Sequence, residues 1–519
     1  MSAFHPLRSG PGPLGLLLGL ALLLLAGTAS AGAQDDEILL EFKRYYKKYK
    51  DTPTRIEAVL SLEGCEQPEV VDVLAPLFDT AEPEVGLSVT RVLAQFKTRP
   101  PVERMLVLLA ETQSQGAKLG ILRAMAQAKY ADTQAGLLPL LGDPAWDVRR
   151  RAIQALAALG DPGVAEPIAA RCTETEVAVR CAALEGLAQL RSELVLAPAR
   201  ADLAHESWQV RASAIAALGS VRHVDSIGPL IERMALEEGR LREDAGAALG
   251  RITGKEFGSR LDAWQNFWKT FEGRFQIPTD EELAKLRAVQ AQRKEQYQGA
   301  PGAVAYHGIE TPSQSIVFVI DVSGSMEQEV VNKERFQDGN YPSWKRIDVI
   351  KTELIKTIRA LEPYVRFNVI AFATDVKLWK KDLVKANPLN KSSAETWVSR
   401  LEAIGGSSKE DLARAGLTGA ANLEGGKTNT FAALMAALGV EEGKELRDYE
   451  TDLDTIFFLS DGRPSHGKFI EPGDVLREVR AVNELRKVVI HTITLGEFEK
   501  DFMERLAQEN GGTFVDLGH

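Results

Sequence analysis

The apolar residues between about 51 and 272 recur at helical spacing, and this helical pattern itself repeats every 31 residues. A period in the low thirties, with helical spacing inside each unit, is typical of stacked helix pairs that bury their apolar faces against one another. The sequence therefore predicts an all-α solenoid over residues 51–272. Its clearest copies carry an apolar residue followed by arginine, at Val148-Arg149, Val179-Arg180, Val210-Arg211 and Leu241-Arg242, and weaker copies begin near Thr54, Val85 and Ala117.

The repeated arginine has two interpretations. It could form a binding stripe, or a structural ladder in which each guanidinium hydrogen-bonds an acidic residue or a carbonyl at the start of a neighbouring helix. We favour the ladder. Trp146 and Trp208 fall in the turns between helices. They are either packed or part of a contact surface, and the pattern does not decide between these.

Both ends of the array have their own signals. Residues 34–50 are predicted to be a capping helix, with acids at the start of its amphipathic stretch and lysines at its end. At the other end, an aromatic helix face is expected to close the solenoid. The polar stretch 278–299 is predicted to be a linker helix within a linker of residues 273–309, which Gly299–Gly302 interrupts. The aromatic face consists of Trp264, Phe267, Trp268 and Phe271.

From about residue 303 the pattern changes to alternating strands and helices. This alternation predicts a doubly wound, Rossmann-like α/β domain over residues 310–519, with a mostly parallel sheet and helices on both faces. The whole chain is therefore expected to be multidomain. The expected strands are 315–320, 365–373, 376–384, 454–459, 488–495 and 513–517, and the expected helices lie near 346–361, 393–404, 409–421, 430–439, 473–486 and 499–509.

Polar residues gather where the predicted strands end. The apolar run 316–320 leads into Asp-Val-Ser-Gly-Ser, a second buried strand at 455–459 leads into Ser-Asp-Gly, and a glycine loop at 425–430 opens a helix. Ligands bind at the carboxyl ends of the strands in such sheets, so these three segments are expected to converge. They supply the candidate site residues Asp321, Ser323, Ser325, Thr428 and Asp461.

All five candidates are hard oxygen donors, with no imidazole or thiolate among them. This donor set suits Mg²⁺, Mn²⁺ or Ca²⁺ better than zinc. A cation held by neutral hydroxyls and water stays electrophilic and can accept a carboxylate from elsewhere. The two aspartates are best placed behind the hydroxyls, where they orient the ligands without neutralising the metal.

These motifs resemble a von Willebrand factor A domain with a metal-ion-dependent adhesion site, the site of integrin I domains. The family's D-x-S-x-S motif matches Asp321, Ser323 and Ser325, its threonine matches Thr428, and its aspartate matches Asp461. The resemblance covers roughly 310–519. It implies that the metal captures an Asp or Glu side chain of a protein partner, and that movement of the threonine couples to the last helix, 499–509.

The repeats in turn resemble the short bacterial form of HEAT repeats, and residues 147–156 fit that pattern best. Together the two parts resemble exported bacterial proteins with von Willebrand factor A domains. Two features depart from the A-domain pattern. Lys427 interrupts the usual Gly-Gly-Thr and bears on how well Thr428 is placed. Insertions at 327–345 and 405–424 flank the site and are either ligand-selecting surfaces or disordered loops.

Composition narrows the partners and the compartment. The 519-residue chain has a net charge of −11, which argues against nucleic acid and anionic membrane surfaces. Its three cysteines are too few for a disulfide framework. Cys172 and Cys181 either pair in an oxidising compartment or are small core residues, and we favour the core.

Residues 1–33 have the pattern of a secretory signal peptide. Arg8 supplies the positive region, residues 14–26 are apolar and Leu-rich, and Ala31-Gly32-Ala33 is a cleavage site. We therefore expect export to the periplasm, the cell surface or the medium, with an uncleaved anchor as the alternative. No later stretch is long and apolar enough to cross a bilayer, so no transmembrane helix is expected in the mature chain.

Three functional hypotheses follow. The first is an exported binding module that uses its cation to capture a partner carboxylate, with the solenoid as a second surface. The second is a scaffold that binds mainly through the solenoid, with a structural metal. The third, a metal-dependent hydrolase, is disfavoured because position 323 is Ser where D-x-D phosphotransferases have Asp, because His466 stands alone, and because no H-E-x-x-H, G-x-S-x-G or P-loop occurs. We expect no enzyme. The partner's identity and the oligomeric state stay open.

Overall fold

The computed structural model describes most of the chain, in two compact units, residues 1–130 and 131–519. The predicted glycine break at 299–302, the predicted helix 409–421 and the first 30 residues of the predicted signal lie outside the described residues. Within the described part, no helix has the length and hydropathy needed to cross a membrane. The described residues are 31–286, 304–306, 308–336, 340–404, 426–440, 451–461, 463–495 and 500–517.

The first unit is helical. Helix α3 packs on α6, and α6 packs on α8, in the order of the weaker sequence repeats. Helix α2 packs on α3, and its Leu39 and Phe42 are buried. The helices are α2 (Ala31–Lys48), α3 (Thr52–Leu60), α4 (Pro68–Leu74), α5 (Leu77–Thr80), α6 (Pro83–Leu93), α7 (Arg99–Glu111) and α8 (Gln115–Ala128).

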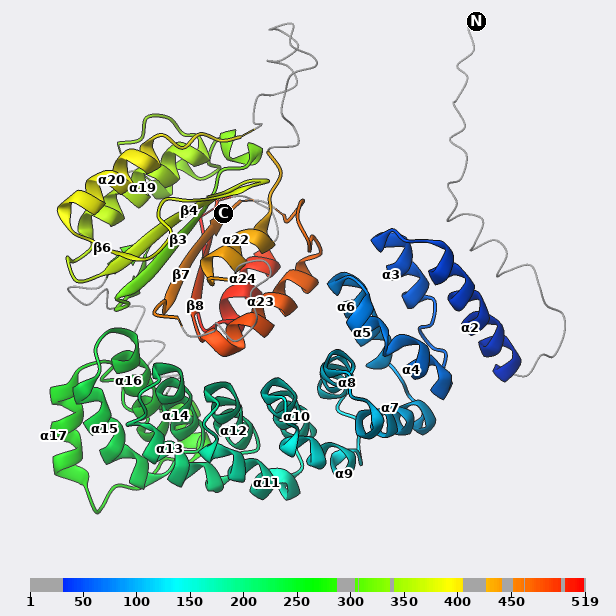
Figure 1. Ribbon diagram of the computed structural model, residues 1–519. Coiled ribbons are helices and arrows are strands. Elements are labelled where there is room, and N and C mark those ends of the chain that lie inside the picture. The colour runs from blue at the N-terminus through cyan, green and yellow to red at the C-terminus, as the bar shows by residue number, and fades with distance from the viewer. Residues whose placement is uncertain are drawn as a thin grey trace, which may run out of the picture. The chain divides into compact units, whose positions relative to one another are not determined.

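The second unit opens with the strong repeats. Helices α10, α12, α14 and α16 stack in succession, and shorter helices connect them (Figure 1). The predicted helical repeat is confirmed here. The helices are α9 (Gln134–Leu137), α10 (Trp146–Leu159), α11 (Ala165–Ala169), α12 (Val177–Gln189), α13 (Leu196–Asp202), α14 (Trp208–Ser220), α15 (Ile227–Leu236), α16 (Gly239–Thr253) and α17 (Leu261–Phe271), with 3₁₀ turns η1 (Leu138–Gly142), η2 (Pro162–Val164), η3 (Ala170–Thr173), η4 (Glu193–Val195) and η5 (Val224–Ser226).

The repeated arginines form a structural ladder. Each of three guanidiniums donates to a carbonyl oxygen in the turn before its own helix and to an acidic side chain of the next repeat. The acidic partners are Glu174 for Arg149 at 3.2 Å, Asp202 for Arg180 at 2.9 Å, and Glu237 for Arg211 at 2.6 Å. Arg242 differs, since it donates to the Ser259 carbonyl oxygen at 3.2 Å. The ladder interpretation is confirmed.

Arg180→Ala is expected to lower the free energy of unfolding by about 3 kcal/mol, because it leaves the buried Asp202 carboxylate without its cation. Arg242 occupies the same position in its repeat, but its partner is a carbonyl oxygen and not a carboxylate. Arg242→Ala is therefore expected to lower the free energy of unfolding by only about 1 kcal/mol. Calorimetric melting of the two variants measures the difference. Equal shifts would show that the ladder depends on the carbonyl bonds alone.

The aromatic face of α17 closes the array only in part. Trp264 and Phe267 are buried, and Trp264 Nε1 donates to the Gly258 carbonyl oxygen at 2.8 Å. Trp268 is half-buried, and Phe271 is 40% exposed. The predicted closing face therefore holds for Trp264 and Phe267 and is wrong for Phe271, which lies at the helix end and is exposed.

Cys172 and Cys181 are buried and are not disulfide-bonded. Burial raises the pKa of the Cys172 thiol to about 12 and that of Cys181 to about 11. Of the two interpretations, the core interpretation is confirmed.

The remainder of the second unit is the predicted α/β domain. Its seven-stranded sheet has the order β5-β4-β3-β7-β8-β9, with β6 also paired to β4. Neighbouring strands from β4 to β9 run parallel, and β5 and β6 are antiparallel to β4. The strands are β3 (Ser315–Asp321), β4 (Arg366–Phe372), β5 (Val376–Leu378), β6 (Val384–Lys385), β7 (Thr455–Ser460), β8 (Val489–Thr494) and β9 (Phe514–Asp516).

Helices cover both faces of this sheet (Figure 1). One face carries α19 (Arg346–Ala360) and α20 (Pro388–Ser399), and the other carries α22 (Thr430–Ala437), α23 (Pro472–Arg486) and α24 (Lys500–Glu509). Residues 316–320 of β3 are buried throughout, as a continuous apolar run in a central strand requires. A separate hairpin, β1 (Val304–Tyr306) and β2 (Ile309–Thr311), precedes the sheet.

Two predicted elements differ from the structure. The single strand expected at 376–384 is wrong, because the chain forms the two short strands β5 and β6 with a charged break between them. In that break the Asn368 side chain bonds the backbone of Lys380 at both its N–H and its carbonyl. The helix expected from 393 begins at Pro388, where the Asn387 side chain caps it by accepting from Asn390 N at 2.9 Å.

Candidate functional site

Sheet topology brings two of the polar segments to one edge. Strands β3 and β7 are parallel neighbours, with Ile320 paired to Leu459. Because both strands run in the same direction, Asp321 and Ser460-Asp461 leave the sheet at the same carboxyl edge. Asp321 and Asp461 are both fully buried there.

A chain of hydrogen bonds joins four of the five predicted site residues. Asp321 Oδ1 accepts from the Ser323 backbone N–H at 2.7 Å, and Asp321 Oδ2 accepts from Ser460 Oγ at 2.6 Å. Ser323 Oγ and Ser325 Oγ lie 3.1 Å apart. Ser325 Oγ donates to Asp461 Oδ1 at 2.6 Å. The two hydroxyls are thus fixed between the two carboxylates.

Backbone bonds hold the loop of the fifth residue, Thr428. Its N–H donates to Ser465 Oγ at 2.9 Å, and its carbonyl accepts from the Ser465 and His466 N–H groups. Gly324 N donates to the Gly426 carbonyl oxygen at 3.1 Å, which ties this loop to the Asp321–Ser325 loop. Thr428 is buried, and the backbone N–H of the intervening Lys427 bonds Thr374 Oγ1 at 3.2 Å.

Arg346, at the first turn of α19, is a site residue that the sequence did not reveal. Its Nη1 donates to Asp461 Oδ2 at 2.6 Å, with the Arg346 side chain 5% exposed and the Asp461 side chain 0%. Its backbone N–H donates to the Gln328 carbonyl oxygen at 2.8 Å. The partners are 115 residues apart, and an arginine at a helix start carries no signal of such a pair. Ser460 and Ser465 were missed for the same reason.

The site carries an excess of buried negative charge. Burial, and then the charge of Asp461, raise the pKa of Asp321 well above its ordinary value. The Arg346 guanidinium pairs with one of the two carboxylates, that of Asp461. A divalent cation among the hydroxyls would offset the remaining charge, so the donor chemistry and electrostatics fit Mg²⁺. Among the described residues there is no cluster of three His, Cys, Asp or Glu side chains that could hold a metal ion.

The insertion at 327–345 is an ordered rim of the site over its described residues, so the disordered-loop interpretation is wrong there. Val330 N donates to the Trp344 carbonyl oxygen at 2.9 Å, and Tyr341 Oη donates to Glu353 at 2.7 Å. Phe336 is buried, with its ring 6.1 Å from that of Tyr341. The other insertion, 405–424, lies outside the described residues.

Comparison with protein families identifies both parts of the chain. The model for HEAT repeats matches residues 102–188 and 165–250. The model for the von Willebrand factor type A domain matches residues 343–516, which include Thr428 and Asp461 but begin after Ser325. The chain therefore contains HEAT repeats and a von Willebrand factor type A domain.

Curated relatives match the A-domain part. Human inter-alpha-trypsin inhibitor heavy chain H4 is 28% identical over 209 residues, and heavy chain H1 of Mesocricetus auratus is 27% identical over 202 residues. These matches cover 40% and 38% of this chain but only 18% of each relative. The chain thus matches less than a fifth of their length. The pairing of HEAT repeats with an A domain supports a protein-interaction module of the adhesion type.

Solved structures that match part of the chain include BatB from Bacteroides thetaiotaomicron, at 13% identity over 39% of this chain and 88% of that one, with a TM-score of 0.25. The PilB minor pilin from Streptococcus sanguinis matches at 13% identity over 43% of this chain and 59% of that one, with a TM-score of 0.27.

Proposed function

We propose that this protein is an exported binding module that uses a divalent cation to capture an Asp or Glu side chain of a protein partner. Ser323, Ser325 and Thr428 hold the cation, with Asp321 and Asp461 behind them. Mg²⁺ is the first choice, with Mn²⁺ or Ca²⁺ as alternatives. The observation that carries the proposal is the hydrogen-bonded run from Asp321 through both serines to Asp461.

A bound cation would supply the electrophile for the partner's carboxylate. The surrounding residues hold the hydroxyl groups that would bind the cation in position. Asp321 fixes the Ser323 backbone, and Asp461 accepts a hydrogen bond from the Ser325 hydroxyl, which leaves the serine oxygen lone pairs available. Arg346 holds Asp461 from the far side. Because the holding groups are neutral hydroxyls, charge is left on the cation for the incoming carboxylate.

Export is proposed from the pattern of residues 1–33. The alternative in which the solenoid is the main binder predicts partner capture that does not depend on a cation, so metal dependence separates the two hypotheses.

The test uses the full chain stripped of metal with EDTA. Mn²⁺ binding is followed by electron paramagnetic resonance, with Mg²⁺ as competitor. Binding to surfaces densely coated with a Glu-containing peptide, or with its Glu→Gln counterpart, is then measured by surface plasmon resonance. We expect one Mn²⁺ site that Mg²⁺ displaces, and retention on the Glu surface only when Mg²⁺ is present. Equal retention in EDTA, or on the Gln surface, contradicts the proposal.

A further inference from the structure

Within the second unit, the repeats contact the A domain at the edge of the sheet opposite the candidate metal site. The contacted segments are the end of α23, residues 451–454 before β7, and residues 312–315 before β3. All lie at or before the amino ends of strands, whereas Asp321 is the last residue of β3 and Asp461 directly follows β7. The contact therefore leaves the metal edge uncovered by the repeats α10–α16.

Glu484 on α23 is the centre of the contact. Its Oε2 accepts from Arg150 Nη1 at 3.2 Å, from Arg151 Nη1 at 3.4 Å and from Gln154 Nε2 at 3.0 Å, all on α10. Burial alone would raise the pKa of Glu484, but the charges of Arg151 and Arg150 outweigh it and lower the pKa. Beside this cluster, Leu485 packs against Ala178, with Trp146 and Val177 around them.

Lys487, which ends α23 in a left-handed conformation at φ 56°, is a second anchor. Its ammonium donates to Glu185 on α12, and its carbonyl oxygen accepts from Arg240 on α16. Arg240 lies over the Trp208 ring, 5.6 Å from its centroid, and Trp208 Nε1 donates to the Thr451 carbonyl oxygen at 2.8 Å. Trp146 and Trp208, whose role the sequence left open, are thus both part of a contact surface.

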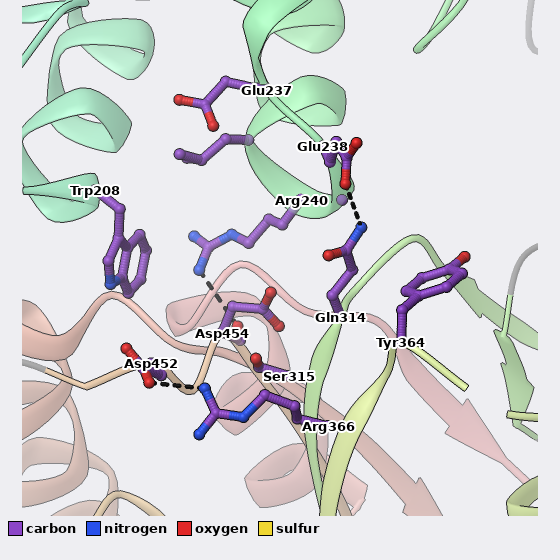
Figure 2. Close-up of a pocket in the computed structure, with 12 residues that line it drawn as sticks. Trp208, Glu237, Glu238, Arg240, Gln314, Ser315, Tyr364, Arg366, Asp452 and Asp454 are labelled. Atoms are coloured by element: carbon purple, nitrogen blue, oxygen red, sulfur yellow. Dashed lines mark hydrogen bonds and ion pairs between the residues drawn. The ribbon is translucent and has the colours of Figure 1, made fainter. Parts of the chain in front are cut away.

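The contact is polar and incompletely closed. Figure 2 shows Trp208 and Arg240 from the repeats facing Asp454 and Arg366 of the A domain. Between them lies a cavity of about 370 Å³, lined by polar and charged side chains together with Trp208, Leu241 and Tyr364. Interfaces between domains that separate are more polar than permanent ones, which resemble a continuous apolar core. This contact has the composition of the separable class.

We propose that the repeats α10–α16 are a built-in partner of the A domain, docked reversibly through Glu484 and Lys487. When the A domain is docked, it covers the solenoid edge that carries Trp146, Arg150, Arg151 and Trp208. When it is released, that edge becomes a second interaction surface. The chemistry of the edge fits a helix end like that of α23, with a carboxylate for the two arginines and, three residues on, a lysine for Glu185.

The test measures the distance between spin labels on Leu194→Cys in the repeats and Leu389→Cys on α20, which are 44% and 83% exposed in the native chain. The three native cysteines are buried, so the introduced thiols take the labels. We expect one narrow distance distribution in the otherwise native chain at low salt. Glu484→Arg, which sets a cation against Arg150 and Arg151, is expected to broaden it, and adding Arg150→Glu and Arg151→Glu is expected to restore it.

Arg477→Glu is the matched control, since it reverses a charge on the same helix but pairs with Asp474 on α23 itself. It is expected to keep the narrow distribution. Salt at about 1 M, where screening acts within about 3 Å, is expected to broaden the distribution of the otherwise native chain. A narrow distance distribution in folded Glu484→Arg overturns the proposal. So does a distribution of the otherwise native chain that stays narrow in high salt. Neither measurement involves the cation, so failure here is distinct from failure of the proposed metal function.

Discussion

Asp321→Asn is expected to change metal affinity and stability in opposite directions. The amide keeps the shape of the buried carboxylate and can still accept from Ser323 N, but it removes one of the two buried negative charges of the site. The metal-free variant is therefore expected to be more stable by about 1–3 kcal/mol. Without the carboxylate behind the hydroxyls, Mg²⁺ affinity is expected to fall by about 10–100-fold. Calorimetric melting in EDTA and Mn²⁺ titration measure the two effects.

Asp474→Asn is the control for this prediction, because Asp474 pairs with Arg477 on the same helix, near the surface. It is expected to change neither quantity appreciably. If the role of Asp321 were purely structural, Asp321→Asn would instead lower the stability of the metal-free protein in EDTA. That outcome, or unchanged Mn²⁺ affinity, would remove Asp321 from the proposed site.

Arg346→Met is expected to destabilise the metal-free protein by about 3–5 kcal/mol, because it leaves the buried Asp461 carboxylate without its cation. A Mg²⁺ held by the hydroxyls would supply positive charge near Asp461, and a ligand that binds only the folded state stabilises it. The rise in melting temperature on adding Mg²⁺ is therefore expected to be larger for Arg346→Met than for the native chain. Differential scanning calorimetry in EDTA gives the loss of stability, and repeating it in Mg²⁺ gives the rise in melting temperature.

Lys345→Met tests the specificity of that effect. Lys345 precedes Arg346, is 46% exposed and pairs with Glu327 on the rim. Its loss is expected to cost about 0.5 kcal/mol and to leave the Mg²⁺ response unchanged. If Mg²⁺ raises the melting temperature of Arg346→Met no more than that of Lys345→Met, the guanidinium does not share its role with the cation.

Much of the fold was predictable because its signals are local or periodic. The 31-residue repeat placed the helices from α10 to α16, and alternating strands and helices placed the sheet and both helix layers. The errors came where local pattern is weak. The pattern at 376–384 predicts one strand, but its charged middle is not part of a strand. There the Lys380 backbone is hydrogen-bonded to the side chain of Asn368 on β4.

The candidate site also has a part that the local sequence predicts and a part that it does not. Asp321, Ser323 and Ser325 follow a buried strand within five residues, so sequence alone brought them together. The link from Ser325 to Asp461 could be inferred only through the expected sheet, and whether Thr428 joins them at a cation stays a prediction. Arg346 was not predictable, because its partner is distant in sequence and nothing around it indicates a pair.

The sequence by itself thus determined the two domain types and the oxygen-rich loop at a strand end, since hydrophobic periodicity and short motifs are properties of neighbouring residues. Only the tertiary structure decided which charges meet. Arg346 neutralises Asp461, three of the four ladder arginines each pair with an acid in the next repeat, and Glu484 binds α10 across more than 300 residues. The physical reason is that an ion pair depends on the distance between the two charges in the folded protein. That distance is not related to their separation in sequence.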